Sequence, residues 1–225
     1  MLIKNLKQLG AKLLPGVAKR RGELRYWRNR QASENGQLGN NHYEPLYTEV
    51  FGLTKDDYRG KRVLDIGCGP RGSLEWADMA AQRVGLDPLA GDYQRELGAA
   101  RHRMEYCTSG SEKIPFPDAH FDVVTCLNAL DHVDDITATI REIKRVTKPG
   151  GLFLLSVETD HPPTIEEPIS ITDAILASFA PEFAVLSEFR VGTPDDHNLH
   201  KAVRSRSPSY TKGEPGMYVG KFARH

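Results

Sequence analysis

Short apolar, β-branched runs alternate along this chain with segments whose apolar residues recur at helical spacing. The runs predict strands at residues 62–66, 83–87, 102–107, 121–126, 152–157, 184–191 and 216–222. The segments between them predict helices at residues 73–82, 92–100, 136–146 and 171–179. This alternation predicts an α/β fold, a doubly wound and mostly parallel seven-stranded sheet with helices on both faces.

Two connections of the predicted sheet have distinctive sequences. Lys148-Pro149-Gly150-Gly151 ends the helix at residues 136–146, because proline cannot continue a helix and glycine tolerates a left-handed turn. Residues 193–214 are polar and lie between the last two predicted strands. They predict a long exposed loop.

The first 58 residues differ in composition from the rest of the chain and contain no predicted strand. Residues 24–58 are polar and rich in aromatic side chains, a pattern that favours helices and loops lying over a domain. We therefore interpret residues 1–58 as a helical N-terminal lid and residues 59–225 as the main domain.

The first thirty residues are strongly basic, with nine Lys or Arg and a single acid, Glu23. Apolar residues recur there at roughly helical spacing, at Leu2, Ile3, Leu6, Leu9, Leu13 and Leu14. One interpretation is a helix that packs these side chains on the domain and is interrupted near Pro15 and Gly16. The other is a helix that lies on an anionic membrane surface, a pattern also similar to an organelle transit peptide.

The overall composition limits which classes of binding partner and which cellular compartment are expected. The 225 residues include 30 Lys or Arg and 30 Asp or Glu, so no net field favours nucleic acid, and a small-molecule partner is easier to accommodate. The cysteines, Cys68, Cys107 and Cys126, form no CxxC pair and no zinc spacing, so we expect no metal site and a reducing cytoplasm. The sequence contains no run of about eighteen apolar residues, so it predicts no membrane-spanning helix. Nothing in the sequence indicates the oligomeric state.

A glycine-rich turn follows the first predicted strand. Residues 67–72, Gly-Cys-Gly-Pro-Arg-Gly, satisfy the G-x-G-x-x-G pattern of dinucleotide sites. A pyrophosphate is disfavoured here, because Asp65 would repel it and Pro70 removes an N–H donor. A cationic amino-acid group suits the turn better, which argues against an NAD-dependent oxidoreductase.

The segment VLDIGCGPRGS resembles the first motif of the class I methyltransferases that depend on S-adenosylmethionine (SAM), and GLDP resembles their acidic second-strand motif. Residues 111–135 and 141–158 resemble the family's fourth-strand and fifth-strand regions, and the similarity is closest to the methyltransferase type 11 group. The resemblance covers residues 61–158. It implies a Rossmann-like methyltransferase fold, SAM as cofactor and a small-molecule methyl acceptor.

The resemblance also implies residue roles. Asp65, Gly67 and Gly69 would hold the methionine end of SAM, and Asp87, followed by Pro88, would hold the ribose hydroxyls. The remaining cofactor positions are Ser111 and Glu112 at the adenine edge, and Asn128 and Leu130 at the floor after the fourth strand. Many relatives carry an aspartate where this chain has Gly110. The adenine contact therefore depends on backbone groups or on Glu112.

Candidates for the acceptor side are less specific. His161 follows the fifth predicted strand and is the leading general base, with His132 a second catalytic candidate. His42, Tyr43 and Tyr47 lie in the expected lid and would contact the substrate. Methylation at O, N or C stays open, and the alternatives are a non-catalytic SAM-binding regulatory module and a lipid-linked or glycan acceptor.

Overall fold

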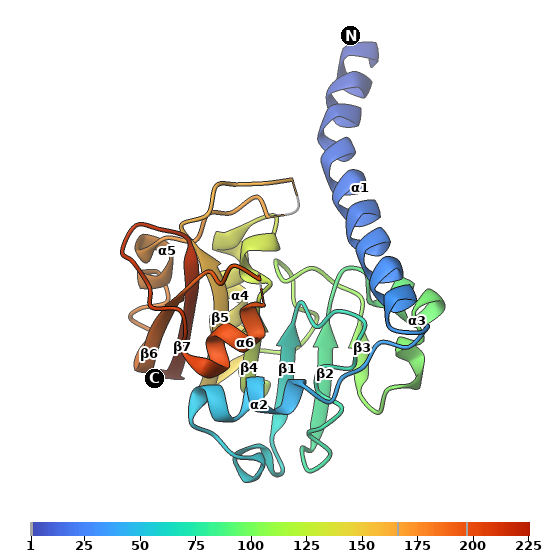
Figure 1. The fold of residues 1–225 in the computed structure, drawn as a ribbon. Helices are drawn as coiled ribbons and strands as arrows, with labels where there is room; N and C mark the ends of the chain where they lie inside the picture. Colours follow the sequence, from blue (N-terminus) through green and yellow to red (C-terminus); the bar gives the residue numbers. More distant parts are fainter. Residues whose placement is uncertain (1, 166, 197) are drawn as a thin grey trace.

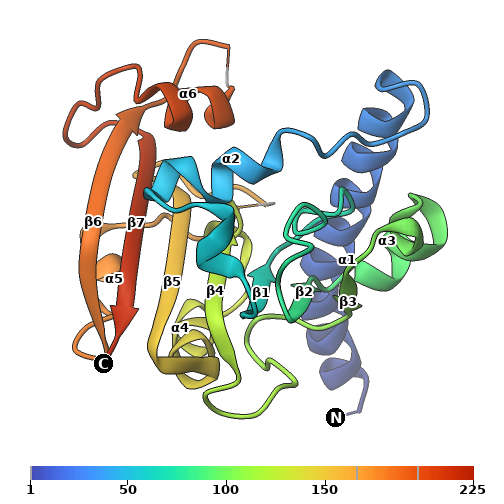
Figure 2. The same cartoon turned by 90° about the horizontal axis from the view of Figure 1, so that it is seen from below.

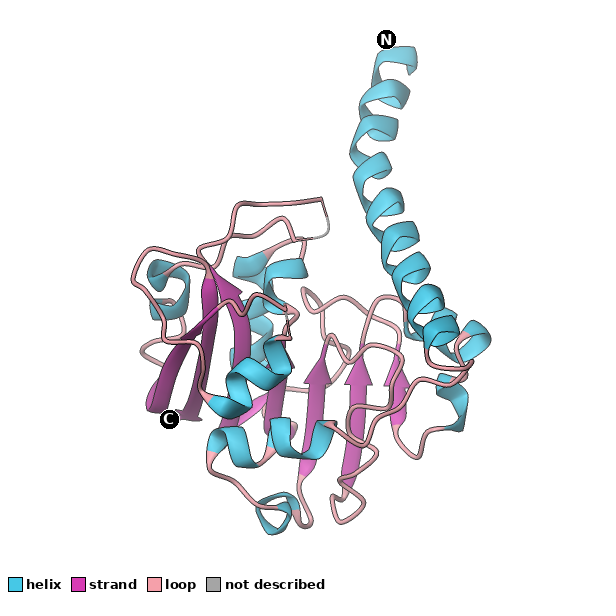
Figure 3. Cartoon of the chain, viewed as in Figure 1, coloured by secondary structure: helices cyan, strands magenta, loops and turns pink. Residues whose placement is uncertain are grey.

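The computed structural model describes residues 2–165, 167–196 and 198–225, and for residues 2–15 it describes the course of the backbone alone. The α-helices are α1 (Leu2–Ser33), α2 (Tyr43–Tyr47), α3 (Ala90–Glu96), α4 (Ile136–Val146), α5 (Asp173–Ala177) and α6 (Leu199–Ser205). Short 3₁₀ turns are η1 (Glu49–Phe51), η2 (Lys55–Tyr58), η3 (Ala99–Arg101) and η4 (Leu130–His132). Figure 3 shows these helices packed around one sheet.

The sheet has seven strands in the order β3-β2-β1-β4-β5-β7-β6 (Figure 2). They are β1 (Arg62–Ile66), β2 (Gln82–Leu86), β3 (Glu105–Cys107), β4 (Phe121–Leu127), β5 (Thr147–Thr159), β6 (Phe183–Gly192) and β7 (Gly216–Arg224). The pairs from β3 to β5 are parallel, and β7 is antiparallel to both of its neighbours. The expected mostly parallel, seven-stranded fold is therefore confirmed.

Apolar side chains cover both faces of the central strands, because consecutive residues of a strand point to opposite faces. Val123 packs in the cluster under α2, whereas Val124 packs in the cluster that includes α4. Helix α4 presents Ile143 and Val146 to that second cluster, and the Asp135 carboxylate caps its first turn by accepting from the Ala138 N–H at 2.9 Å. Fully buried strands of this kind read as continuous apolar runs, which is why β4 and β5 were predictable.

Two predicted elements are wrong. Residues 73–81 form no helix but a series of tight turns, in which the N–H groups of Glu75, Ala77 and Ala80 each bond the carbonyl three residues earlier, and Gln82 begins β2. The polar segment 193–214 is not only a loop, since it contains α6.

Helix α1 extends past the body of the molecule in Figure 1, and its C-terminal part lies beside α3 (Figure 2). It is one continuous helix, so the interruption predicted near Pro15 and Gly16 is wrong. Ion pairs of Arg20 with Asp92 and of Arg28 with Glu96 hold its second half against α3.

The apolar side chains on which both interpretations of the N-terminus depend, from Leu2 to Leu14, lie outside the residues whose side chains are described. Membrane contact therefore stays a prediction, as does the division of the chain after residue 58. Within the described parts of the chain, no helix is long and apolar enough to span a bilayer.

Strand β1 lies between β2 and β4, so the chain runs outward from it in both directions along the sheet. At such a switch point the loops after neighbouring parallel strands diverge and leave a crevice at the carboxyl ends of the strands. The fold thus places the glycine turn after β1, the turn after β2 and the loop after β4 around one space.

Candidate active site

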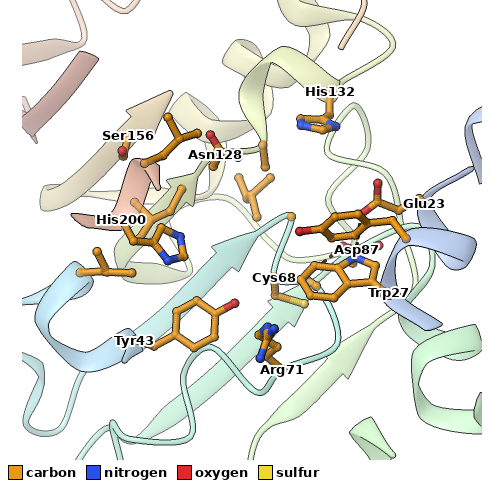
Figure 4. A pocket seen from close by; sticks show the side chains of 18 of the residues that line it. Glu23, Trp27, Tyr43, Cys68, Arg71, Asp87, Asn128, His132, Ser156 and His200 are labelled. Carbon is orange, nitrogen blue, oxygen red and sulfur yellow. Dashed lines mark hydrogen bonds between the residues drawn. The ribbon is translucent and has the colours of Figure 1, made fainter. Parts of the chain in front are cut away.

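One large cavity, of about 1780 Å³, opens over the carboxyl ends of β1, β2 and β4. Residues from α1, α2 and α6 also line it. In Figure 4, Trp27 and Asp87 lie at one end, and His200 and Ser156 at the other. The cavity exceeds the few hundred to about 1000 Å³ of most single-ligand sites, so it has room for two molecules.

The glycine turn forms the floor of one end, which we call the cofactor half. Gly67 has φ +71°, and a Cβ atom there would lie 2.2 Å from Cβ of Ala129. Gly69 has φ +58°, and its Cβ position would be 3.3 Å from the Trp27 indole. Both positions need glycine for backbone freedom and for close approach, which leaves bare backbone facing the cavity.

Asp87 stands at the end of β2 on the same wall. Its carboxylate accepts hydrogen bonds from the N–H groups of Leu89 at 2.8 Å and of Gly69 at 3.2 Å. Burial raises the pKa of Asp87 to about 6, against the lowering effect of these two donors. The carboxylate is fixed in place and lines the cavity beside Pro88, and the predicted contact of both residues with the cofactor stays a prediction.

The predicted adenine edge is also in the cavity wall, but its side chains are already engaged. The Ser111 hydroxyl bonds that of Thr139 at 2.9 Å. The Glu112 carboxylate accepts from the Asp134 N–H at 2.8 Å, in the turn before α4. Gly110 lines the cavity without a side chain, and its carbonyl accepts from the Ser109 hydroxyl at 3.2 Å.

Asn128 follows β4 with φ +54°, an uncommon conformation for a residue that is not glycine. Its N–H donates to the Ser156 carbonyl at 2.6 Å, and its buried Oδ1 has no hydrogen-bond partner among the described residues. Asn128 is among the residues that line the cavity, and its contact with the cofactor stays a prediction. Leu130 does not line the cavity, because it is fully buried in the core beneath.

Asp65 is the clearest departure from the predicted cofactor contacts, since it is buried beneath the cavity and does not line it. Its carboxylate accepts from the Tyr47 hydroxyl at 2.9 Å, from the Thr125 hydroxyl at 2.6 Å and from Ser73. Burial raises its pKa to about 6, opposed by these three donors. Asp65 therefore joins the sheet to α2, and the Tyr47 hydroxyl is used in that contact.

Helix α1 closes the cofactor half, with residues that the sequence did not single out. The Trp27 indole lies over the glycine turn and donates to the Glu23 carboxylate at 2.7 Å. Arg71 stacks on that indole, 5.5 Å from its centre, and binds Glu34 through both nitrogens. The basic, aromatic sequence RYWRNR indicated a lid. It did not indicate which of its rings would lie over the glycine turn.

Aromatic rings form the opposite end, which we call the acceptor half. His42 and Tyr43 at the start of α2 line it, and the His42 ring stacks on that of His200 at a centroid distance of 5.5 Å. Desolvation by surrounding atoms, with the charges of His42 and Arg71, lowers the pKa of His200 to about 4. At neutral pH this imidazole is therefore uncharged.

The two predicted catalytic histidines occupy different places. His132 lines the cavity (Figure 4). His161 is not among the lining residues, since it is buried behind Asp131, with its Nε2 3.5 Å from the Asp131 carboxylate. The structure therefore does not bring His161 to the acceptor half, where His200 lies instead.

Comparison with known proteins agrees with this geometry. Residues 64–155 match a family model described as a methyltransferase domain. Residues 64–155 therefore form a methyltransferase domain. A crystal structure titled S-adenosylmethionine dependent methyltransferase, from Mesorhizobium loti, has the same fold, with a TM-score of 0.54, 20% identity and coverage of 74% of this chain and 92% of that one.

Two curated relatives bear on function. A methyltransferase described as uncharacterized, YcgJ of Bacillus subtilis, is 33% identical over 67% of this chain and 50% of its own length. A ubiquinone biosynthesis O-methyltransferase of Pseudomonas aeruginosa is 40% identical over 46% of this chain and 47% of its own length. The chain thus spans about half the length of these relatives.

Proposed function

We propose that this protein transfers a methyl group from SAM to a small-molecule acceptor, at an oxygen or nitrogen atom. The observation that carries the proposal is a single cavity that joins the glycine turn at one end to neutral aromatic and histidine side chains at the other. The Pseudomonas relative is named as an O-methyltransferase, which favours oxygen.

The cofactor half fits SAM on its own chemistry. The Asp87 carboxylate, held by two backbone N–H groups, can accept from both ribose hydroxyls. The bare turn at Gly67 leaves room for the methionine end, and Asn128 lines the cavity after β4. Glu23 adds a carboxylate from α1 to the same half.

The protein's task in methyl transfer is alignment, because a sulfonium already supplies a reactive methyl group. Rings at Tyr43 and His200 bound the acceptor half and exclude water from it. Neutral His200 accepts a hydrogen bond from an acceptor hydroxyl and so orients its oxygen towards the methyl group, because its low pKa leaves the imidazole uncharged throughout the neutral range.

A regulatory SAM-binding module is the competing function. Such a module needs no space beyond its ligand, whereas this cavity continues past Asn128 to Ser156 and His200. The additional space favours an enzyme with a second substrate.

Calorimetry tests cofactor choice first. We expect micromolar binding of SAM and of its demethylated product, and no binding of NAD, because Pro70 removes a donor that a pyrophosphate would use. Incubation with labelled SAM and a metabolite extract, followed by mass spectrometry, then identifies the acceptor. NAD binding as tight as SAM would refute the cofactor assignment, and SAM binding without any labelled product would favour the regulatory module.

A further inference from the structure

A cluster of ligating side chains lies at the edge of the cavity, beyond the groups that the proposed reaction uses. We define this rim cluster as Asp131, His132, His161 and Glu167. One ligating atom each from Asp131, His132 and Glu167 lies within 4.8 Å of the other two. These residues come from η4 and from the loop after β5, which the Ile169 N–H ties to the Asp131 carbonyl at 3.2 Å.

The separations within the rim cluster are too long for hydrogen bonds. His132 Nε2 is 3.9 Å from Asp131 Oδ1 and 3.7 Å from Glu167 Oε1. His161 Nε2 is 3.5 Å from Asp131 Oδ2. Ligands of a tetrahedral ion with bonds of about 2.0–2.1 Å lie roughly 3.3 Å apart, so these spacings suit atoms that share a cation.

Asp131 is a buried carboxylate with no partner of its own. Its side chain is 1% exposed, and among the described residues neither of its oxygens accepts a hydrogen bond. The nearby Lys19 ammonium contacts the Asp134 carboxylate and the His132 carbonyl instead. Because an isolated buried charge is costly, this position calls for a cation.

His161 directs its ring nitrogen Nε2 towards the Asp131 carboxylate. Its Nδ1 lies 3.0 Å from the Pro162 carbonyl, which can only accept, so Nδ1 carries the proton and donates. In the neutral ring Nε2 then has a free lone pair, and this buried atom has no partner among the described residues. A histidine whose other nitrogen is held by a carbonyl is the usual form of a metal ligand.

We propose that the rim cluster binds one divalent transition-metal ion. Two imidazoles with two carboxylates favour Zn²⁺ or Mn²⁺ over Mg²⁺ or Ca²⁺, which prefer oxygen alone. His132 and Glu167 line the cavity, whereas Asp131 and His161 lie behind them. An ion held there has coordination positions open to the cavity, and, if the proposed function holds, these suit an acceptor that carries oxygen ligands.

Metal binding is tested on the full chain without SAM or acceptor. The protein is stripped with a chelator, dialysed, and equilibrated separately with Zn²⁺, Mn²⁺ and Mg²⁺, and bound metal is measured by mass spectrometry. We expect one Zn²⁺ or Mn²⁺ per chain, weaker Mg²⁺ binding, and a Tm that rises with the bound ion. Absence of stoichiometric binding of any of the three ions would overturn the proposal.

Variants locate the site. Glu167 lies on a partly exposed loop, so the Glu167→Gln variant is expected to fold normally. It is expected to bind Zn²⁺ at least tenfold more weakly than the wild type, and so is His161→Ala. Glu214→Gln, a remote exposed glutamate, serves as the matched control and is expected to bind like wild type. Wild-type affinity in both cluster variants would place any bound metal elsewhere and refute the rim cluster.

Calorimetry of SAM binding in the presence of chelator separates this proposal from the proposed function. SAM binding without metal binding overturns the rim cluster alone, whereas metal binding without SAM binding overturns the proposed function and leaves the metal site standing.

Discussion

The two halves of the cavity are built in different ways. In the cofactor half the chain turns tightly at positive φ, and backbone N–H groups fix the Asp87 carboxylate. In the acceptor half the wall consists of rings from α2 and α6, where His42 meets His200 although 157 residues separate them in the chain. The residues of the cofactor half lie close together in the sequence. The acceptor half forms only when the segments that carry His42 and His200 come together.

The two halves therefore contribute to different properties, the cofactor half to SAM affinity and the acceptor half to the choice of acceptor. A ligand held mostly by backbone and by one fixed carboxylate depends on turn geometry, which many acceptor pockets can share. A pocket made of side chains on short helices can change its shape by substitution without disturbing the sheet. We therefore expect changes in the acceptor half to affect turnover and acceptor choice, and changes in the cofactor half to affect SAM affinity.

The largest effect that this comparison predicts is on turnover, from His200→Ala. Loss of the side chain that orients the acceptor lowers kcat by about 10²-fold, while SAM affinity stays at the wild-type value because His200 is at the other end of the cavity. Steady-state kinetics and calorimetry measure the two quantities. His225→Ala, at the exposed C-terminus, is the control. If kcat persisted while SAM affinity fell, the two halves would be assigned the wrong way round.

Asp87→Ala is expected to give the opposite pattern. Removing the carboxylate leaves ribose hydroxyls and two backbone N–H groups without a partner, which costs about 1–3 kcal/mol, or roughly 5- to 150-fold in the Kd of SAM. The kcat at saturating SAM should change little. Calorimetry with SAM provides the measurement, and an unchanged Kd in a folded variant would remove Asp87 from the cofactor site.

The pH dependence of SAM affinity sharpens this assignment. Burial raises the pKa of Asp87 in the free protein to about 6, and we expect SAM to bind the charged carboxylate. Below pH 6 the carboxyl group must lose a proton on binding, so affinity falls by about tenfold per pH unit, whereas above pH 6 it is flat. Asp87→Asn should abolish this slope, and a slope that persists in the variant would point to another group.

The smallest expected effect concerns the helix that closes the cofactor half. The hydrogen bonds from Arg71 hold the pKa of Glu34 at about 2, so this pairing stabilises the fold above the ordinary glutamate pKa and is lost as the pH falls towards 2. Glu34→Gln weakens the contact under Trp27 and should lower SAM affinity by roughly two- to tenfold.

Glu182→Gln is the matched control for Glu34→Gln, because it breaks an ion pair with Lys144 at a distance from the cavity. Thermal unfolding of both variants at neutral pH checks that any loss of SAM affinity is not a general loss of stability. Equal SAM affinity in the two variants would show that the closing helix does not need this pair.

The sequence predicted the strands and the glycine turn around the cofactor half because their signals are local. Continuous apolar runs marked β1 and β4, and the spacing from Gly67 to Asp87 placed two cavity walls together. The role predicted for Asp65 was wrong for a physical reason, since a carboxylate at a strand end can face either the cavity or the core. Here three hydroxyl donors hold it in the core.

The acceptor half could not be predicted in the same way, although one signal was present. Asn198 caps α6 by accepting from the Lys201 N–H at 3.0 Å, and Leu199, Ala202 and Val203, at helical spacing, pack in one core cluster. This capped pattern would have identified a helix inside the polar segment. That His200 then faces His42 depends on tertiary packing that no local pattern encodes. The same holds for Trp27, whose position follows from the path of α1.

The hydrogen bond between Tyr47 and Asp65 has a consequence for how molecules enter and leave. Swinging α2 outward would break the bond to a buried carboxylate, so α2 behaves as a fixed wall. Helix α6 is held by an exposed ion pair between Arg204 and Glu49 and also by Ala202 and Val203, which are buried in the core cluster. Because the buried apolar contacts cost more to break than the ion pair, we expect both helices to stay in place during turnover.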